Sequence, residues 1–161
     1  MTVLRFATHL WFDDQAEEAA KFYTSLFEDS RIDRVIPAPA GIPGGVKEGR
    51  PFIVDLTLMG QNYTFLNGGP DFPFNAQVSL YVLCDGQAEV DHYWDALMAG
   101  GGAPQQCGWL TDRFGLSWQV IPVQLEQLMD GSDPEATQRV VEAMLKMIKI
   151  DVAGLEAAAR G

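Results

Sequence analysis

An internal repeat is the feature of this sequence that most constrains its fold. An apolar stripe at helical spacing in residues 15–27 returns in residues 87–101, at an offset of 71 positions. The matched residues of the two stripes are Ala19 and Val90, Phe22 and Tyr93, Tyr23 and Trp94, Leu26 and Leu97, and Phe27 and Met98. A repeated amphipathic helix with short apolar segments around it is typical of a duplicated supersecondary unit. We therefore expect two modules, each with the order strand, helix and then three strands.

Short strand-like segments surround both predicted helices. They cover residues 4–12, 30–36, 52–58 and 63–66 in the first module, and 76–84, 104–110 and 116–121 in the second. The turn at Gly60-Gln61 predicts a hairpin, and Asp13-Asp14 are expected to cap the first helix. Residues 37–51 hold four prolines and four glycines, which predicts a long loop. This loop either connects two strands or covers a binding site.

The C-terminal part of the chain lies outside the repeat. Ser132-Asp133-Pro134 is typical of a helix start, so we predict a helix over residues 135–147 and a last helix from an Asp151 cap to Ala159. We divide the chain into a first module at 1–70, a second at 71–122 and a helical extension at 123–161, within one compact domain. Antiparallel hairpins combined with helical crossovers predict an α+β fold with curved mixed sheets.

Charge and composition exclude several classes of protein. The net charge is −11, from 22 acidic and 11 basic residues, which argues against nucleic acid or an anionic membrane surface as a partner. The two cysteines, Cys84 and Cys107, form neither a disulfide framework nor a Cys-x-x-Cys pair. The N-terminus shows no secretory signal, and no apolar run reaches the ~20 residues of a membrane span. We expect a cytoplasmic protein.

Five segments resemble a known family. They are LWFDDQAEEAAKFYTSLF (10–27), GQNYTFLNGGPDFPFN (60–75), EVDHYWDAL (89–97), QCGWLTDRFGLSWQVIP (106–122) and RVVEAMLKMIKIDVAGLEAA (139–158). They resemble the PhnB-like branch of the vicinal oxygen chelate superfamily, which includes glyoxalase I, extradiol dioxygenases and the fosfomycin and bleomycin resistance proteins. This branch is often labelled 3-demethylubiquinone-9 3-methyltransferase. The resemblance implies two βαβββ modules whose sheets enclose a cavity, and a homodimer in which modules pair within or between chains.

The resemblance also implies a divalent metal held by His and Glu side chains from the first and last strands of the modules. Gln119 stands where the glutamate belongs, and a neutral amide is a poor ligand for a divalent cation. The ligand position of the first strand falls on Ala7 or His9, and the matching segments 77–80 and 63–66 contain neither His nor Glu. Because one His and one Gln do not make a site with three or four ligands, we assign no cofactor. A divalent metal stays an alternative.

We expect a small-molecule ligand inside the cavity. Strand alternation places His9 and Trp11 on one face, and it turns Gln119 inward if Trp118 and Val120 face the helix. The predicted lining is His9, Trp11, Cys107, Trp109, Ser117 and Gln119.

Several of these residues have a second interpretation. His9 is a metal ligand or general base, or it is an interior residue bonded to a backbone carbonyl. Cys107 is a reactive thiolate if Arg113 lowers its pKa, or a packed inert thiol. The tryptophans stack on a ligand or belong to the core. Asp55 faces either solvent or the cavity.

Three functions agree with these residues. They are a metal-dependent lyase, isomerase or dioxygenase, a non-catalytic binding protein of the bleomycin-resistance type, and a dimeric scaffold with a filled pocket. Gln119 and the missing ligands favour the second and third, whereas the 37–51 loop and the tryptophans favour a ligand. We therefore predict a glyoxalase-like small-molecule protein, with catalysis left open. Methyl transfer is rejected, because Gly100-Gly101-Gly102 follows a helix and precedes a strand. The apolar residues of helix 135–147 favour a homodimer.

Overall fold

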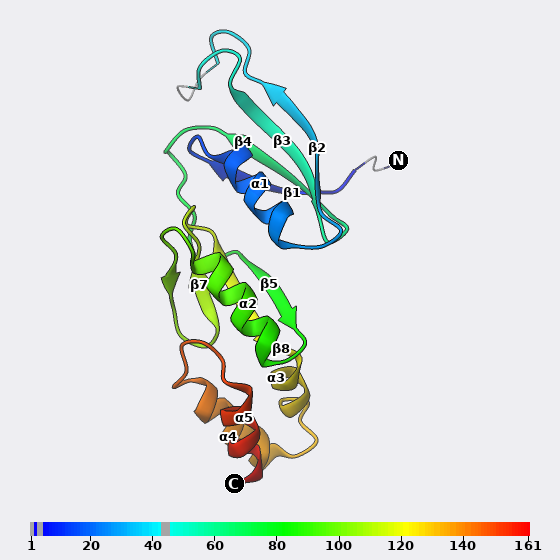
Figure 1. The fold of residues 1–161 in the computed structure, drawn as a ribbon, viewed down its shortest axis with the longest axis vertical. Coiled ribbons are helices and arrows are strands. Elements are labelled where there is room, and N and C mark those ends of the chain that lie inside the picture. Colours follow the sequence, from blue (N-terminus) through cyan, green and yellow to red (C-terminus); the bar gives the residue numbers. More distant parts are fainter. Residues whose placement is uncertain (1, 3–4, 43–45) are drawn as a thin grey trace. The chain divides into compact units, whose positions relative to one another are not determined.

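The computed structural model of the chain describes residue 2 and residues 5–42 and 46–161. The chain divides into two compact units, Met1–Phe74 and Asn75–Gly161. Each unit contains a four-stranded mixed sheet and a helix that packs against it (Figure 1). The prediction of an α+β fold with two βαβββ modules and C-terminal helices is confirmed.

The first unit has the strand order β1-β4-β3-β2. Its elements are β1 (Thr8–Phe12), α1 (Ala16–Leu26), β2 (Arg31–Pro37), β3 (Pro51–Leu58) and β4 (Gln61–Asn67). β1 is parallel to β4, and the other neighbours are antiparallel. The predicted strand over residues 4–12 is too long at its start: pairing with β4 begins at Thr8, opposite Tyr63, and Leu4 lies outside the described residues. Part of the predicted 37–51 loop, residues 43–45, also lies outside them.

One face of this first sheet forms the core of the unit. α1 covers it with Ala16, Ala19, Ala20 and Tyr23, which are all fully buried. The small alanines allow the helix axis to approach the strands closely, and Tyr23 meets the Phe65 ring edge-on with centroids 5.9 Å apart. Because strand side chains alternate, the opposite face carries His9 and Trp11 and has no helix of its own unit over it. We call it the open face of the first sheet.

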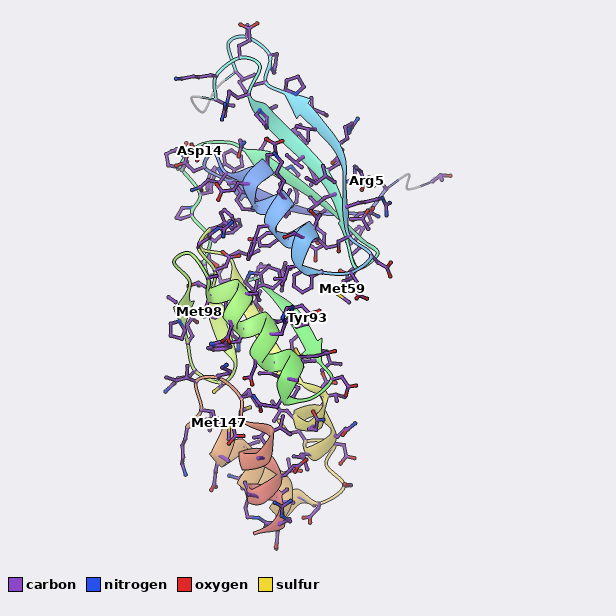
Figure 2. All side chains as sticks on the ribbon, viewed as in Figure 1. Arg5, Asp14, Met59, Tyr93, Met98 and Met147 are labelled. Atoms are coloured by element: carbon purple, nitrogen blue, oxygen red, sulfur yellow. The ribbon has the colours of Figure 1, made fainter. Side chains whose placement is uncertain are left out.

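The start of α1 corrects the sequence prediction. The N-cap is Gln15, and no side chain of the N-cap position accepts a hydrogen bond from the helix. Asp13 and Asp14 therefore do not cap α1, although Asp14 lies beside its start (Figure 2). The backbone N–H of Ala16 instead donates to Asn67 Oδ1 at 2.8 Å. This acceptor is available because β1–β4 pairing sets Phe12 opposite Asn67, just where the chain leaves β1.

The second unit repeats this topology, with the strand order β5-β8-β7-β6. Its module consists of β5 (Ser79–Cys84), α2 (Gln87–Met98), β6 (Ala103–Pro104), β7 (Trp109–Thr111) and β8 (Ser117–Pro122). The single strand predicted over 104–110 is wrong, because a turn divides it into β6 and β7. Cys107 and Gly108 adopt left-handed backbone conformations there, with φ of 60° and 80°. Such angles cannot continue a strand.

Three helices complete the second unit: α3 (Val123–Leu128), α4 (Pro134–Met144) and α5 (Val152–Arg160). The predicted caps of α4 and α5 are confirmed, because Asp133 Oδ1 accepts from two helix N–H groups and Asp151 Oδ1 from one. α3 was not predicted. The helices share a core made of Ile121, Leu125, Val140, Ile150 and Leu155.

Apolar residues of α4 that the sequence analysis assigned to a dimer contact pack instead within the second unit. Val140 is fully buried in the core of the unit, and Met144 packs against that core. Leu145 is 55% exposed. Among the described residues, no helix combines the length and apolar character of a membrane span.

Candidate functional site

The open face of the first sheet presents two rows of side chains that run across its four strands. Residues paired in register make a polar row of His9, Thr64, Asp55 and Arg34. Two positions further along the strands, Trp11, Leu66, Ile53 and Ile36 make an apolar row. We refer to these sets as the polar row and the apolar row. Together they place charged and apolar side chains next to each other on one surface.

Asp55 is the centre of the polar row, and only 5% of its surface is exposed. Arg34 donates to Asp55 Oδ2 from Nε at 3.0 Å and from Nη2 at 2.6 Å. Thr64 Oγ1 donates to Asp55 Oδ1 at 2.7 Å, and Arg5 Nη1 lies 3.2 Å from the same oxygen. Burial opposes ionisation of Asp55, but these hydrogen bonds and the charge of Arg5 outweigh it and hold the pKa of Asp55 below its usual value. The sequence left the direction of Asp55 open, and the structure places it on the open face.

Sequence reasoning missed Arg5 and Arg34 as members of this cluster. Arg34 is opposite Asp55 in the β2–β3 pairing, which a register assignment could have found. Arg5 (Figure 2) precedes β1. Its Nη2 donates to the carbonyl of Tyr63 and to Thr64 Oγ1, both on β4. No local sequence pattern predicts this contact.

His9 and Trp11 both lie on the open face of the first sheet, as alternation predicted. His9 is exposed, and within the described part of the chain no hydrogen bond to its imidazole is recorded. Within the first unit, no bond to a backbone carbonyl therefore supports a structural role for His9. Trp11 is half-buried and fixed: its Nε1 donates to Gly69 O at 2.8 Å, and its ring meets Phe72 edge-on at 5.0 Å. Its ring also fills the space that a Cβ on Gly68 would need.

The face of the second sheet opposite α2, which we call its open face, carries three more of the predicted residues. Ser79, Ser117 and Thr111 form one row across β5, β8 and β7, and Tyr81, Gln119 and Trp109 form the next. Gln119 Nε2 donates to Ser79 Oγ at 2.9 Å. Trp118 and Val120 are buried on the other face, where α2 packs against β8. The predicted alternation of β8 is thus confirmed.

Ser117 is the unusual member of these rows. Only 1% of its surface is exposed, and its hydroxyl has no hydrogen-bond partner among the residues that the structure describes. Most buried hydroxyls in native proteins are bonded. The unpartnered hydroxyl of Ser117, beside the amide of Gln119, is therefore available to form a hydrogen bond with a polar group of a ligand.

Cys107 lies in the turn between β6 and β7 and not on a strand. Its backbone N–H donates to Met147 O, and that of Gly108 to Ile148 O, each at 2.8 Å, so the turn is fastened to the segment between α4 and α5. Arg113 lies beyond the other end of β7, with its guanidinium 4.8 Å from the centre of the Phe114 ring. The structure therefore gives no support to Arg113 as the group that activates Cys107.

The side chains near His9 and Gln119 do not fit a divalent metal. In the described ranges, no three His, Cys, Asp or Glu side chains are grouped closely enough to hold an ion. The register neighbour of His9 is Thr64, and Gln119 is bonded to Ser79. Arg5 and Arg34, which occupy the carboxylate of Asp55, would also repel a cation at the polar row.

A hollow of about 590 Å³ lies elsewhere in the first unit, at the N-terminus of α1. Its lining includes four carboxylates of residues 13–18, together with Lys47 and Arg50. None of the predicted site residues lines it, and the N–H of Ala16 at this helix end is already bonded to Asn67. We do not include it in the candidate site.

Comparison with known proteins relates the two modules to solved structures. A PhnB protein from Bacillus cereus is 34% identical over 73% of this chain and 98% of its own, with a TM-score of 0.65. Protein PA1353 from Pseudomonas aeruginosa, 21% identical over 74% of this chain and 98% of its own, shares the fold with a TM-score of 0.59. A search of curated proteins gives no match. The family model described as 3-demethylubiquinone-9 3-methyltransferase matches residues 4–121, which is the extent of both modules. On this match and the likeness to the Bacillus cereus protein, the chain belongs to that family, in its PhnB-like branch.

Proposed function

We propose that this protein binds a small molecule on the open face of its second sheet, through hydrogen bonds and without a metal. The observation that carries the proposal is the buried, unpartnered hydroxyl of Ser117. Leaving a buried hydroxyl unbonded costs about 1–3 kcal/mol. A ligand that bonds to Ser117 removes that cost, so the site favours occupation by a polar group.

The chemistry of the surrounding side chains indicates the kind of group. Ser79, Thr111 and Ser117 offer hydroxyls, and Gln119 offers an amide, so these four side chains can both donate and accept without carrying a charge. Trp109 and Tyr81 flank Gln119 and supply aromatic surface. We infer a neutral ligand with a carbonyl, hydroxyl or amide group on a planar body.

Binding without catalysis is the function that these residues favour. A neutral amide replaces the carboxylate that a metal-dependent relative would use, and Cys107 lies in a turn at the opposite end of β7 from Arg113. The family description names a methyl transfer, but the strand-to-helix turns here read DDQ and DG and are not glycine-rich. We therefore propose a sequestering protein of the bleomycin-resistance type. The cavity between paired modules, the contribution of His9 and Trp11, the homodimer and the cytoplasmic location remain predictions.

The substitution Ser117→Ala tests this proposal with benzamide as a neutral, planar probe. Removing an unpartnered hydroxyl should raise the stability of the free protein by about 1 kcal/mol and weaken benzamide binding about ten-fold. In contrast, Ser79→Ala removes a hydroxyl that accepts a bond and should lower stability. Urea titration gives the stabilities, and calorimetry gives the affinities. If Ser117→Ala lowers stability and leaves benzamide binding unchanged, the Ser117 hydroxyl is not a ligand group.

Metal analysis separates binding from metal-dependent catalysis. We expect no stoichiometric divalent metal in protein purified without chelator, and finding one would favour the enzyme. Gln119→Glu should raise the affinity for Zn²⁺ if His9 and Gln119 are what remains of a metal site, because it restores a charged ligand. If calorimetry detects no Zn²⁺ binding to the unmodified protein or to Gln119→Glu, His9 and Gln119 are not what remains of a metal site.

A further inference from the structure

We propose that the first module carries a second ligand site, in which Arg5 and Arg34 receive the carboxylate of a small amphipathic organic acid. The site lies on the polar row. The buried carboxylate of Asp55 bonds to both arginines and orients them. None of the residues of this site belongs to the neutral site proposed on the second sheet. Three properties of the open face of the first sheet support it: its charge, the anchoring of the arginines and the adjacent apolar row.

The charge of this cluster is opposite to that of the whole chain. Arg5 and Arg34 carry two positive charges, and Asp55 carries one negative charge. In the part of the chain that the structure describes, neither arginine pairs with a carboxylate other than Asp55. Two other charged residues of β2, Arg31 and Asp33, pair with each other at 2.7 Å. One positive charge is therefore left over locally, in a protein of net charge −11, and this excess matches a monovalent anion.

Both arginines are held on one side and remain accessible on the other. Nε and Nη2 of Arg34 donate to Asp55, while 61% of the Arg34 side chain stays exposed. Arg5 is bonded to Asp55, Tyr63 O and Thr64 while 43% of its side chain stays exposed. A guanidinium has five N–H donors in a planar fork, so each retains donors for a further oxyanion. Because Asp55 is buried and fixes their orientation, binding costs less side-chain entropy.

The apolar row defines the rest of the ligand. Trp11, Ile53, Ile36 and Leu66 lie two positions further along the same strands, which is roughly 7 Å from the polar row. All four are only partly buried. An acid whose ring or chain extends about this far from its carboxylate can contact both rows at once. A bare anion contacts only the polar row, and a phosphate monoester brings more negative charge than the local excess offers.

Calorimetry with sodium 3-phenylpropionate tests the site. Its neutral analogue, 3-phenylpropanol, and inorganic phosphate serve as comparison ligands. We expect the acid to bind at least about ten-fold more tightly than the alcohol, and more tightly than phosphate. Arg34→Gln and Arg5→Gln should each weaken the acid about ten-fold or more, with little effect on the alcohol.

Arg31→Gln is the matched control, because Arg31 lies on the same strand and face but pairs with Asp33. It should change the affinity for the acid less than about two-fold, in line with an exposed charge. If Arg34→Gln fails to fold, Arg34→Lys keeps the charge and should retain the preference for acid over alcohol with reduced affinity.

Three results would overturn the proposal. They are equal binding of acid and alcohol, equal losses in the Arg31 and Arg34 variants, and phosphate binding more tightly than the acid. Ser117→Ala should leave phenylpropionate binding unchanged. A loss in that variant would place the acid on the second sheet and also contradict a separate site.

Discussion

Asn67→Ala is the substitution that tests most directly how α1 is positioned. Asn67 is 3% exposed, and its amide bonds on both sides: Oδ1 accepts from Ala16 N–H at 2.8 Å, and Nδ2 donates to Pro51 O at 2.9 Å. Alanine removes both bonds and leaves a helix N–H and a strand carbonyl without these partners. A buried group left unbonded costs about 1–3 kcal/mol. With two groups, of which Pro51 is only partly buried, we expect a loss of about 2–4 kcal/mol.

The assay is urea unfolding followed by far-ultraviolet circular dichroism. The loss should appear as a lower midpoint at an unchanged slope. Asp14→Ala is the control, because the sequence points to Asp14 as the cap while the structure shows no such bond. It should cost under about 1 kcal/mol, the value of a carboxylate near the positive end of a helix dipole.

The relative size of the two losses decides the question. If Asp14→Ala costs as much as Asn67→Ala, a local carboxylate caps the helix and the bond from β4 is dispensable. A loss below about 0.5 kcal/mol for Asn67→Ala would equally refute the reasoning, since it is the size expected of a surface substitution.

Three further predictions concern single residues. Because the pKa of Asp55 in the folded protein lies below its usual 3.8, the unfolded chain takes up the proton first as the pH falls. The free energy of unfolding should therefore fall as the pH drops through 3.8. Asp55→Asn should make the free energy of unfolding depend less on pH in this range, as measured in acid titrations. Asp133→Ala removes the cap of α4 and should cost about 1 kcal/mol in thermal or urea unfolding; an unchanged midpoint would contradict the cap. Burial and the nearby Glu89 raise the pKa of Cys84 to about 11, so a thiol reagent at pH 8 should label the partly exposed Cys107 in the folded protein and Cys84 only after unfolding. Equal labelling rates would contradict this.

The sequence by itself determined the modules, because their signals are local and periodic. Apolar spacing of 3.6 residues identified α1 and α2, and alternation fixed which face of β8 carries Gln119. The caps at Asp133 and Asp151 were equally readable, since each bonds to a backbone group within three residues. Periodicity also set the fold class, because a repeated βαβββ order leaves few topologies.

Only the tertiary structure decided what those faces can do. The cap of α1 comes from Asn67, 51 residues beyond Ala16 in the chain, and the two arginines of the Asp55 cluster come from β2 and from the segment before β1. These contacts depend on strand register and on the reach of long side chains, which no local pattern encodes. The same holds for Ser117, whose missing partner is a property of everything packed around it. Periodicity can assign a residue to a face, but burial and hydrogen bonding there are set by neighbours that are distant in sequence.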